Sequence, residues 1–135
     1  MSPALLPFVA LAGGVGAIAR YQVTRRIVLA ASRPGDESRS GMRFLPALGT
    51  AAVNLVGAFA AGLLLGTSPS GGLQMPAAVA AVGFVGAFTT FSAWMAEVVE
   101  LWQGRRRVAA LTHLLGTLAV GILLAALGLA LTSPG

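Results

Sequence analysis

The stretch Gly83-Phe-Val-Gly-Ala-Phe-Thr-Thr-Phe-Ser-Ala-Trp94 lies inside an apolar run long enough to cross a lipid bilayer. It combines two glycines, three hydroxyl side chains and four aromatic rings, and it carries no charge. Lipid offers no water to free backbone polar groups, so a segment that weakens the helix there must face protein or a water-filled path. Transport proteins often coordinate ions at such interrupted helices. We therefore expect the working centre of the protein at this segment.

The overall composition is that of an integral membrane protein. Of the 135 residues, 56% are hydrophobic and only 10% are charged, whereas soluble domains carry about 25% charged residues. No hydrophilic block is large enough for a second folded unit, so we expect one four-helix membrane domain over residues 1–135. The absence of cysteine excludes disulfide and thiolate chemistry. One histidine and four carboxylates argue against a hydrolytic site or an all-protein metal cage, so we do not expect an enzyme.

Four apolar segments reach the roughly 20 residues that a spanning helix needs. Turn-forming or polar residues connect them at 33–41, 67–72 and 103–107. The predicted spans are Pro3–Val23 with Ile27–Ala31 as a candidate interfacial extension, Phe44–Leu65, Met75–Leu101 and Val108–Leu131.

Small residues recur at four-residue spacing, which lets helix backbones approach closely in a bilayer and favours an oligomer. The stretch Gly13-Gly-Val-Gly-Ala17 superficially matches a dinucleotide-binding loop. That interpretation needs a preceding strand and a following acidic residue, and the sequence has neither. Close packing is the better explanation for the pairs Gly13/Ala17, Gly57/Ala61 and Gly62/Gly66.

All basic residues are arginines, and all nine lie on one side of the predicted topology, because the connections after the first and third spans share a side. Short loops rich in arginine stay in the cytoplasm, so both termini are expected outside. The arginines lie beside apolar spans rather than on a soluble face, which favours anionic lipid over nucleic acid as a partner. They are Arg20, Arg25, Arg26, Arg33, Arg39, Arg43, Arg105, Arg106 and Arg107.

Three polar positions inside the spans each allow two interpretations. Arg20, followed by Tyr21, is either an anchor that snorkels to the interface or a positive charge at a pore mouth. Asn54 either clamps neighbouring helices or donates hydrogen bonds to an anion in transit. His113, four residues before Thr117, either bonds a headgroup or a neighbouring helix or faces a pore.

Aromatic residues recur at helical spacing in the third span, and such a stripe more often serves packing than function. Here hydroxyl side chains share the same turns, and ring edges together with hydroxyl donors suit a small hydrated anion. Unwound carbonyls at this place would suit a hard cation instead. For Glu97 and Glu100, close to the arginines at 105–107, a solvated ion-pair face is the simplest interpretation, and it is favoured for Glu100. The stripe comprises Phe84, Phe88, Phe91 and Trp94, and the hydroxyls are those of Thr89, Thr90 and Ser92.

Three segments together resemble one family, the small bacterial fluoride channels called CrcB or Fluc. They are Gly13-Gly-Val-Gly-Ala-Ile-Ala-Arg20-Tyr21, Gly49-Thr-Ala-Ala-Val-Asn54-Leu-Val-Gly57 and Gly83-Phe-Val-Gly-Ala-Phe-Thr-Thr-Phe-Ser92. Each is weak alone, but in this order and on these spans the combination is specific and covers nearly the whole sequence. The resemblance implies an all-α, antiparallel, dual-pore dimer in the bacterial plasma membrane. Such a channel lets cytoplasmic fluoride leave down its electrochemical gradient and so reduces fluoride toxicity.

The resemblance also implies roles for individual residues. A sodium ion at the dimer centre would be held by the backbone carbonyls of Gly86 and Thr89. Arg20 would match the vestibule arginine, Asn54 the pore amide and Phe91 the first of two pore phenylalanines. The other implied positions along the fluoride pore are Thr90, Ser92, Trp94, His113 and Thr117.

This chain departs from the family pattern at two places along the implied pore. Trp94 stands where the second pore phenylalanine would be, preceded by Ala93 instead of threonine, and its bulkier ring could narrow or block one pore. His113 replaces the usual tyrosine.

The arginine pattern bears on the partner. An antiparallel homodimer needs a chain that inserts both ways, which calls for nearly balanced loop charge, and this chain is strongly biased. We therefore predict that it pairs with a second, oppositely biased homologue.

Two other functions are weighed against the channel. A small four-span multidrug or cation exporter needs an intramembrane carboxylate to exchange protons for its substrate. The first span has none, and Glu97 is expected near the interface. A non-conducting assembly subunit would explain the small-residue packing but leaves Asn54 and the hydroxyl-rich break without a purpose.

Overall fold

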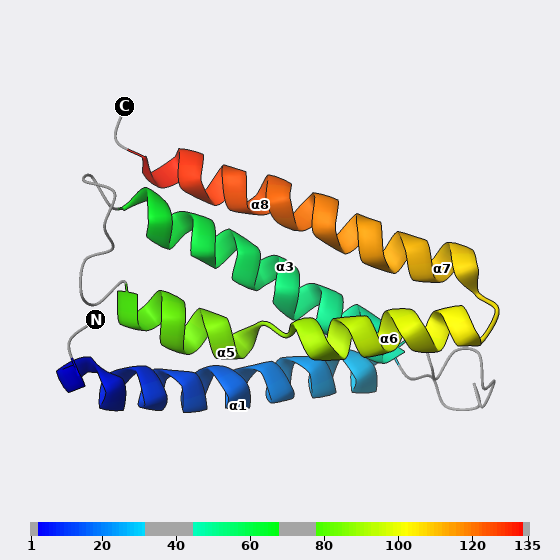
Figure 1. Cartoon of the computed structure of the whole chain (residues 1–135), viewed down its shortest axis with the longest axis horizontal. Coiled ribbons are helices and arrows are strands. Elements are labelled where there is room, and N and C mark those ends of the chain that lie inside the picture. Colours follow the sequence, from blue (N-terminus) through cyan, green and yellow to red (C-terminus); the bar gives the residue numbers. More distant parts are fainter. Residues whose placement is uncertain (1–2, 32–44, 68–77, 134–135) are drawn as a thin grey trace.

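The computed structural model describes residues 3–31, 45–67 and 78–133, and most of these residues are helical and none forms a strand. Four of its helices are long and apolar enough to cross a membrane, as the sequence predicts. The elements, labelled in Figure 1, are η1 (Pro3–Leu5) and α1 (Leu6–Ala31), α3 (Leu45–Gly66), then η2 (Ala80–Val85), α5 (Gly86–Phe88) and α6 (Phe91–Gln103), and finally α7 (Arg107–Leu111), η3 (Thr112–Gly116) and α8 (Thr117–Thr132).

The bounds of the first helix differ from the prediction. The span expected to end at Val23 continues without interruption to Ala31, so Ile27–Ala31 extends the helix. At about 1.5 Å per residue, the 26 residues of α1 measure about 39 Å, which exceeds the roughly 30 Å of a bilayer core. The predicted connection at 33–41 and most of that at 67–72 lie outside the described residues. The predicted turn at 103–107 is confirmed, because α6 ends at Gln103 and α7 begins at Arg107.

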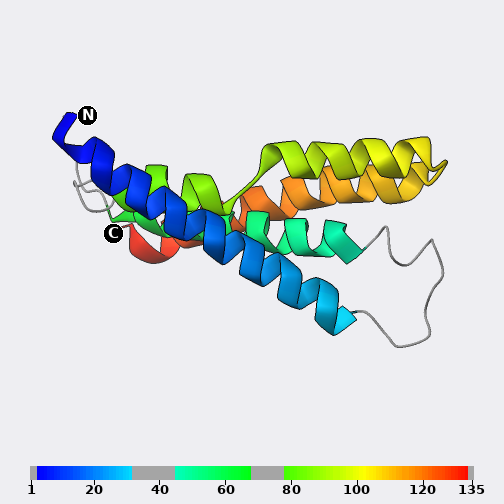
Figure 2. The ribbon, with the colours of Figure 1, turned by 90° about the horizontal axis from the view of Figure 1, so that it is seen from below.

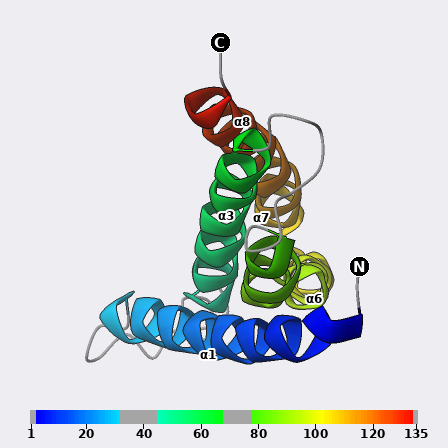
Figure 3. The same ribbon diagram turned by 90° about the vertical axis from the view of Figure 1, so that its left-hand side faces the viewer.

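The four spans run side by side along the long axis of the molecule (Figure 1). Both ends of the chain lie at one end of this bundle, and the C-terminal end of α1 lies with the α6–α7 turn at the other. Of the described arginines, Arg25, Arg26 and those at 105–107 therefore gather at one end, as the topology predicts. In the end-on view of Figure 3, α3 stands between α1 and α8.

Glycines set the closeness of the helix contacts. A side chain on Gly128 of α8 would approach the backbone nitrogen of Leu63 in α3 to 2.8 Å, and one on Gly66 would approach the carbonyl oxygen of Leu129 to 2.7 Å. Where η2 packs on α1, a side chain on Gly83 would come within 2.7 Å of the Val9 carbonyl oxygen. Nothing larger than a hydrogen fits at these crossings. The predicted close packing is confirmed at Gly57, Gly62 and Gly66, whereas a side chain on Gly13 would make only ordinary contacts, 3.6 Å from the nearest atom.

The π-helical turns η2 and η3 interrupt the regular α-helix in the third and fourth spans. Such bulges occur frequently at functional sites, because they re-aim side chains within a helix. η2 is separated from the break in the third span only by the three residues of α5, and η3 contains His113. Both π-helical turns therefore lie at or near residues that the sequence analysis proposes for the site, Thr89 and Thr90 in the third span and His113 in the fourth.

Candidate functional site

The third span breaks between α5 and α6, as predicted. Thr89 (φ −83°, ψ 161°) and Thr90 (φ −149°, ψ 118°) both adopt extended backbone. We call these two residues the break. Figure 2 shows the ribbon crossing over from the first half of the span to α6 at this point. The amide and the hydroxyl of Thr89 both donate to the Val85 carbonyl at 3.0 Å, which closes the first half-helix.

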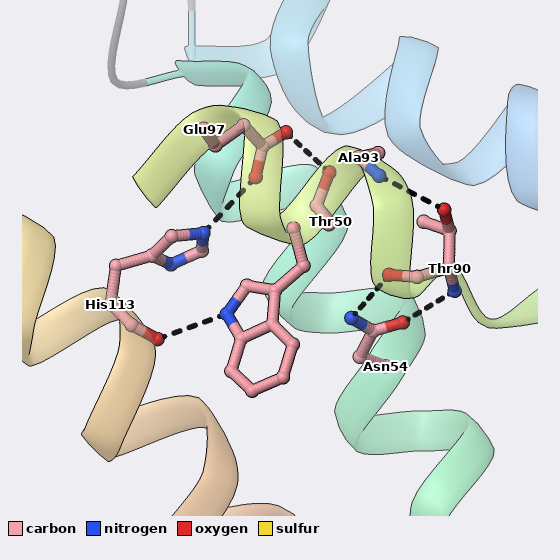
Figure 4. Close-up of polar contacts among 7 residues, drawn as sticks. Thr50, Asn54, Thr90, Ala93, Glu97 and His113 are labelled. Carbon is pink, nitrogen blue, oxygen red and sulfur yellow. Dashed lines mark hydrogen bonds and ion pairs between the residues drawn. The ribbon is translucent and has the colours of Figure 1, made fainter. Parts of the chain in front are cut away.

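Asn54 of α3 holds the break by both ends of its carboxamide (Figure 4). Its Oδ1 accepts from the Thr90 amide at 2.8 Å, and its Nδ2 donates to the Thr90 carbonyl at 3.1 Å. An extended residue leaves its amide without the usual helical acceptor, while the carbonyl of Thr90, the N-cap of α6, also accepts the first bond of that helix. Of the two interpretations of Asn54, the clamp between helices is therefore present, and the carboxamide retains a second N–H that could serve an anion.

The break diverts the helical donors of two carbonyls. In a continuous helix the Thr90 amide would donate to Gly86 and the Ala93 amide to Thr89. Instead, the Thr90 amide donates to Asn54, and the Ala93 amide donates to Oγ1 of Thr90 at 3.3 Å. The Gly86 and Thr89 carbonyls, the pair that the family resemblance implies for a cation, are thus released from the helix ladder.

Arg20 lies well inside α1 and reaches the break rather than the membrane surface. Its Nη1 donates to the carbonyl of Thr89 at 3.4 Å. The guanidinium is only partly exposed. A positive charge is thereby fixed beside the half-helix end, where carbonyls carry partial negative charge. This contact argues against a simple interfacial anchor, and the role of Arg20 at a pore mouth stays a prediction.

The aromatic stripe is divided by the break. Phe84 and Phe88 stack on each other before it, with ring centroids 5.6 Å apart. After it, Phe91 and Trp94 meet edge to face at 5.9 Å, but their surroundings differ. Phe91 is 71% exposed, whereas Trp94 is 9% exposed and its Nε1 donates to the His113 carbonyl at 3.2 Å. Trp94 therefore ties the third span to the fourth, while the ring of Phe91 remains accessible.

A buried polar cluster below the break was only partly anticipated. Glu97 accepts from Oγ1 of Thr50 at 2.6 Å through Oε1, and its Oε2 lies 3.0 Å from Nε2 of His113 (Figure 4). The side chains of His113 and Glu97 are 6% and 13% exposed. The interpretation of Glu97 as part of a solvated face is therefore wrong, although it fits the exposed Glu100. Sequence reasoning missed Thr50, whose only signal is its place one turn before Asn54.

Two grooves pass along these side chains. The first, which we call the break groove, has a volume of about 460 Å³. The second, the arginine groove, has a volume of about 820 Å³ and extends toward the α6–α7 turn. Thr117 lines both, so the two grooves adjoin there. The predicted residues along the break groove are Asn54, Thr89, Thr90, Phe91, Trp94 and Thr117, and His113 lines the arginine groove.

The remaining predicted residues are placed less directly. Ser92 is exposed and its Oγ lies 3.3 Å from Oγ1 of Thr90, beside the break groove rather than in its lining. Arg20 and Gly86 do not line either groove. The site therefore consists of a hydroxyl- and amide-lined groove on one side of the break and a released pair of carbonyls with Arg20 at the break itself.

Comparison with known proteins agrees with the resemblance of the three motifs. The family model described as CrcB-like protein, Camphor Resistance (CrcB), matches residues 7–129. The chain is 40% identical over 126 residues to fluoride-specific ion channel FluC 1 of Symbiobacterium thermophilum, covering 91% of this chain and 93% of that protein. It is 39% identical over 121 residues to FluC 1 of Geobacillus kaustophilus, covering 90% and 91%. It is 37% identical over 123 residues to FluC 2 of Mycobacterium bovis, covering 89% and 84%.

Proposed function

Because this chain belongs to the CrcB-like protein family, we propose that it is a subunit of a fluoride channel that lets fluoride leave the cytoplasm passively. It is a multi-pass membrane protein, and its family consists of channels rather than enzymes. The relatives named above are fluoride-specific ion channels, and this chain matches nearly the whole length of two of them. The observation that carries the proposal is the break groove, where the Asn54 carboxamide, threonine hydroxyls and the Phe91 ring line one continuous surface.

The chemistry of the break groove suits a small, strongly hydrated anion. Fluoride gives up water only where other donors replace it, and hydroxyl and amide groups can do so one at a time. The edges of aromatic rings carry partial positive charge and add further contacts. Within a mostly apolar lining, Thr90, Asn54 and Thr117 supply donors, and Phe91 supplies an accessible ring. These groups would replace part of the hydration of an anion that passes along the groove.

The structure gives the exporter alternative one feature to weigh. Glu97 is largely buried inside the bundle, and an intramembrane carboxylate is what a proton-coupled exporter needs. Both of its oxygens are already engaged, one by Thr50 and the other by His113. The carboxylate is therefore committed to the protein, and the family favours the channel.

We further propose that a sodium ion is held at the break by the carbonyls of Gly86 and Thr89. Both carbonyls have lost their helical donors, and hard cations are bound by such oxygens. A carbonyl oxygen has two lone pairs, so Thr89 can accept from Arg20 and still face an ion. When bound, sodium would supply a positive charge that draws the half-helix ends of two chains together.

The arginine distribution supports a specific partner and orientation. We propose that the arginine-rich end lies in the cytoplasm of a bacterial cell and that both termini lie outside. A chain with this bias inserts one way, so its antiparallel partner is an oppositely biased homologue rather than a second copy. In such an antiparallel dimer, the family resemblance implies two pores.

Reconstitution tests the function and the partner together. The chain is incorporated into liposomes alone, or with a homologue whose arginines lie on the opposite connections, and fluoride release is followed with an electrode. The proposal predicts rapid release from the mixed pair and little from this chain alone. Release from this chain alone, with both orientations present, would contradict the heterodimer. No release from any pairing would contradict the channel.

A further inference from the structure

The arginines of the α6–α7 turn line a groove that adjoins the proposed pathway. Arg105, Arg106 and Arg107 lie at one end of the arginine groove, and Thr117 lies where it meets the break groove. His113, which lies between Arg107 and Thr117 in the sequence, also lines the arginine groove. We infer that these three arginines collect anions at the cytoplasmic mouth of this half of the channel, an inference that rests on the proposed function.

The turn holds the arginines in a defined arrangement. Arg105 has a φ of 59°, a left-handed conformation that favours glycine, yet an arginine occupies it. The guanidinium of Arg107 lies over the Trp102 ring at 5.4 Å from its centroid. Such stacking restrains a flexible cation without neutralising it. The charges are therefore positioned at the groove rather than free to spread over the surface.

The local charge is positive on balance. Among the described residues that line the arginine groove, none is acidic. Glu100, exposed on α6 one turn before Gly104, is the carboxylate nearest in sequence to the three arginines and offsets only part of their charge. Glu97 is engaged by Thr50 and His113. A concave site with one sign of charge and low-dielectric walls focuses the field and raises the local concentration of counter-ions. Fluoride would accordingly be enriched where it enters.

This chain offers a matched control for the charge. Arg25 and Arg26 are exposed on α1 at the same end of the molecule, and neither lines a groove. Replacing them by glutamine (R25Q/R26Q) removes as much charge as R105Q/R107Q. A third variant, R105K/R107K, keeps the charge and loses the guanidinium geometry.

The first experiment measures fluoride release by the wild-type pair and the three variants at two ionic strengths. The Debye length is about 30 Å at 0.01 M and about 3 Å at 1 M. At 0.01 M we expect R105Q/R107Q to slow release about tenfold, the lower end of electrostatic focusing. R25Q/R26Q and R105K/R107K should stay near the wild-type rate, and the deficit should vanish at 1 M. An equal deficit at both ionic strengths, or an equal effect of R25Q/R26Q, would overturn the inference.

An anionic lipid headgroup carries the same kind of charge as the proposed cargo, so the lipid composition is varied as well. The deficit of R105Q/R107Q should be the same in neutral vesicles and in vesicles with anionic lipid. A deficit found only with anionic lipid would assign the arginines to headgroup binding and overturn their role in anion entry.

A second experiment needs no conduction and therefore separates failure of this inference from failure of the proposed function. In a W94F background Trp102 is the one remaining tryptophan, and its fluorescence reports the potential beside Arg107. Quenching by iodide is divided by quenching by neutral acrylamide, which corrects for changes in exposure. At low salt we expect this ratio to fall several-fold in R105Q/R107Q, as electrostatic enrichment requires, and to be unchanged in R25Q/R26Q. An unchanged ratio in R105Q/R107Q would overturn the inference whether or not the wild type releases fluoride.

Discussion

Replacing Asn54 by leucine should destabilise the break, because one side chain satisfies both backbone groups of Thr90. The hydrogen bonds measure 2.8 Å and 3.1 Å, and both join α3 to the start of α6. Leucine has nearly the same size but no polar atom, so the Thr90 amide would be left unpaired, whereas the Thr90 carbonyl, at the N-cap of α6, keeps the first bond of that helix. An unpaired buried amide costs about 1–3 kcal/mol. We therefore predict a loss of about 1–3 kcal/mol in the free energy of unfolding.

Thermal unfolding in detergent, followed by the fluorescence of the buried Trp94, measures this loss. A change of this size corresponds to a fall in Tm on the order of 10 °C for a chain of this length. Gln22→Leu is the matched control, since it makes the same chemical change at an exposed position of α1. We expect the control to stay within about 0.5 kcal/mol of the wild type. If Asn54→Leu unfolds at the same temperature as Gln22→Leu, the carboxamide does not hold the break and the reasoning fails.

Two further perturbations test the packing and the polar cluster. Removing one member of the Glu97–His113 pair, as in Glu97→Gln or His113→Leu, should cost about 1–3 kcal/mol because the partner is left buried without its hydrogen bond. A double-mutant cycle in chemical denaturation should give a coupling above about 0.5 kcal/mol, and strict additivity would show that the pair does not interact. A side chain on Gly57 would overlap the methyl group of Thr89, so Gly57→Ala should cost about 1–3 kcal/mol. Thr89→Ser removes that methyl group and should restore stability in the Gly57→Ala/Thr89→Ser double variant. Gly14→Ala is the control and should not destabilise the protein, because Gly14 has open space around it. A Gly57→Ala variant as stable as Gly14→Ala would contradict the close approach of α3 to the break.

Much of the fold follows from local sequence properties. Long apolar runs specify the four spans, and the clustering of glycine with threonine at 86–90 specifies the break. The end of α1 was misplaced because Arg20 interrupts the apolar run, which left Ile27–Ala31 only as a candidate extension. A helix continues past the membrane surface as long as its residues favour it, so charge marks the depth of the bilayer and not the end of the helix.

The site was predictable only as a set of residues, because its geometry depends on contacts between distant parts of the chain. Asn54 was singled out, but its partner lies 36 residues away and no local pattern identifies it. Trp94 was assigned to the pore by position, while the structure engages its indole nitrogen with the fourth span. Glu97 was interpreted from its nearness to arginines in sequence, whereas the folded chain brings Thr50 and His113 to it. Tertiary pairing decides the role of each of these polar groups.

The central claim is that fluoride passes along the break groove, and the most direct measurement compares two phenylalanine variants. Phe91 lines that groove and is 71% exposed, whereas Phe84 stacks on Phe88 before the break and does not line it. Fluoride release from liposomes is measured for Phe91→Ile and Phe84→Ile, each paired with the partner that gives release with the wild type. The account predicts that Phe91→Ile abolishes release and that Phe84→Ile retains it. Unimpaired release by Phe91→Ile would contradict the account.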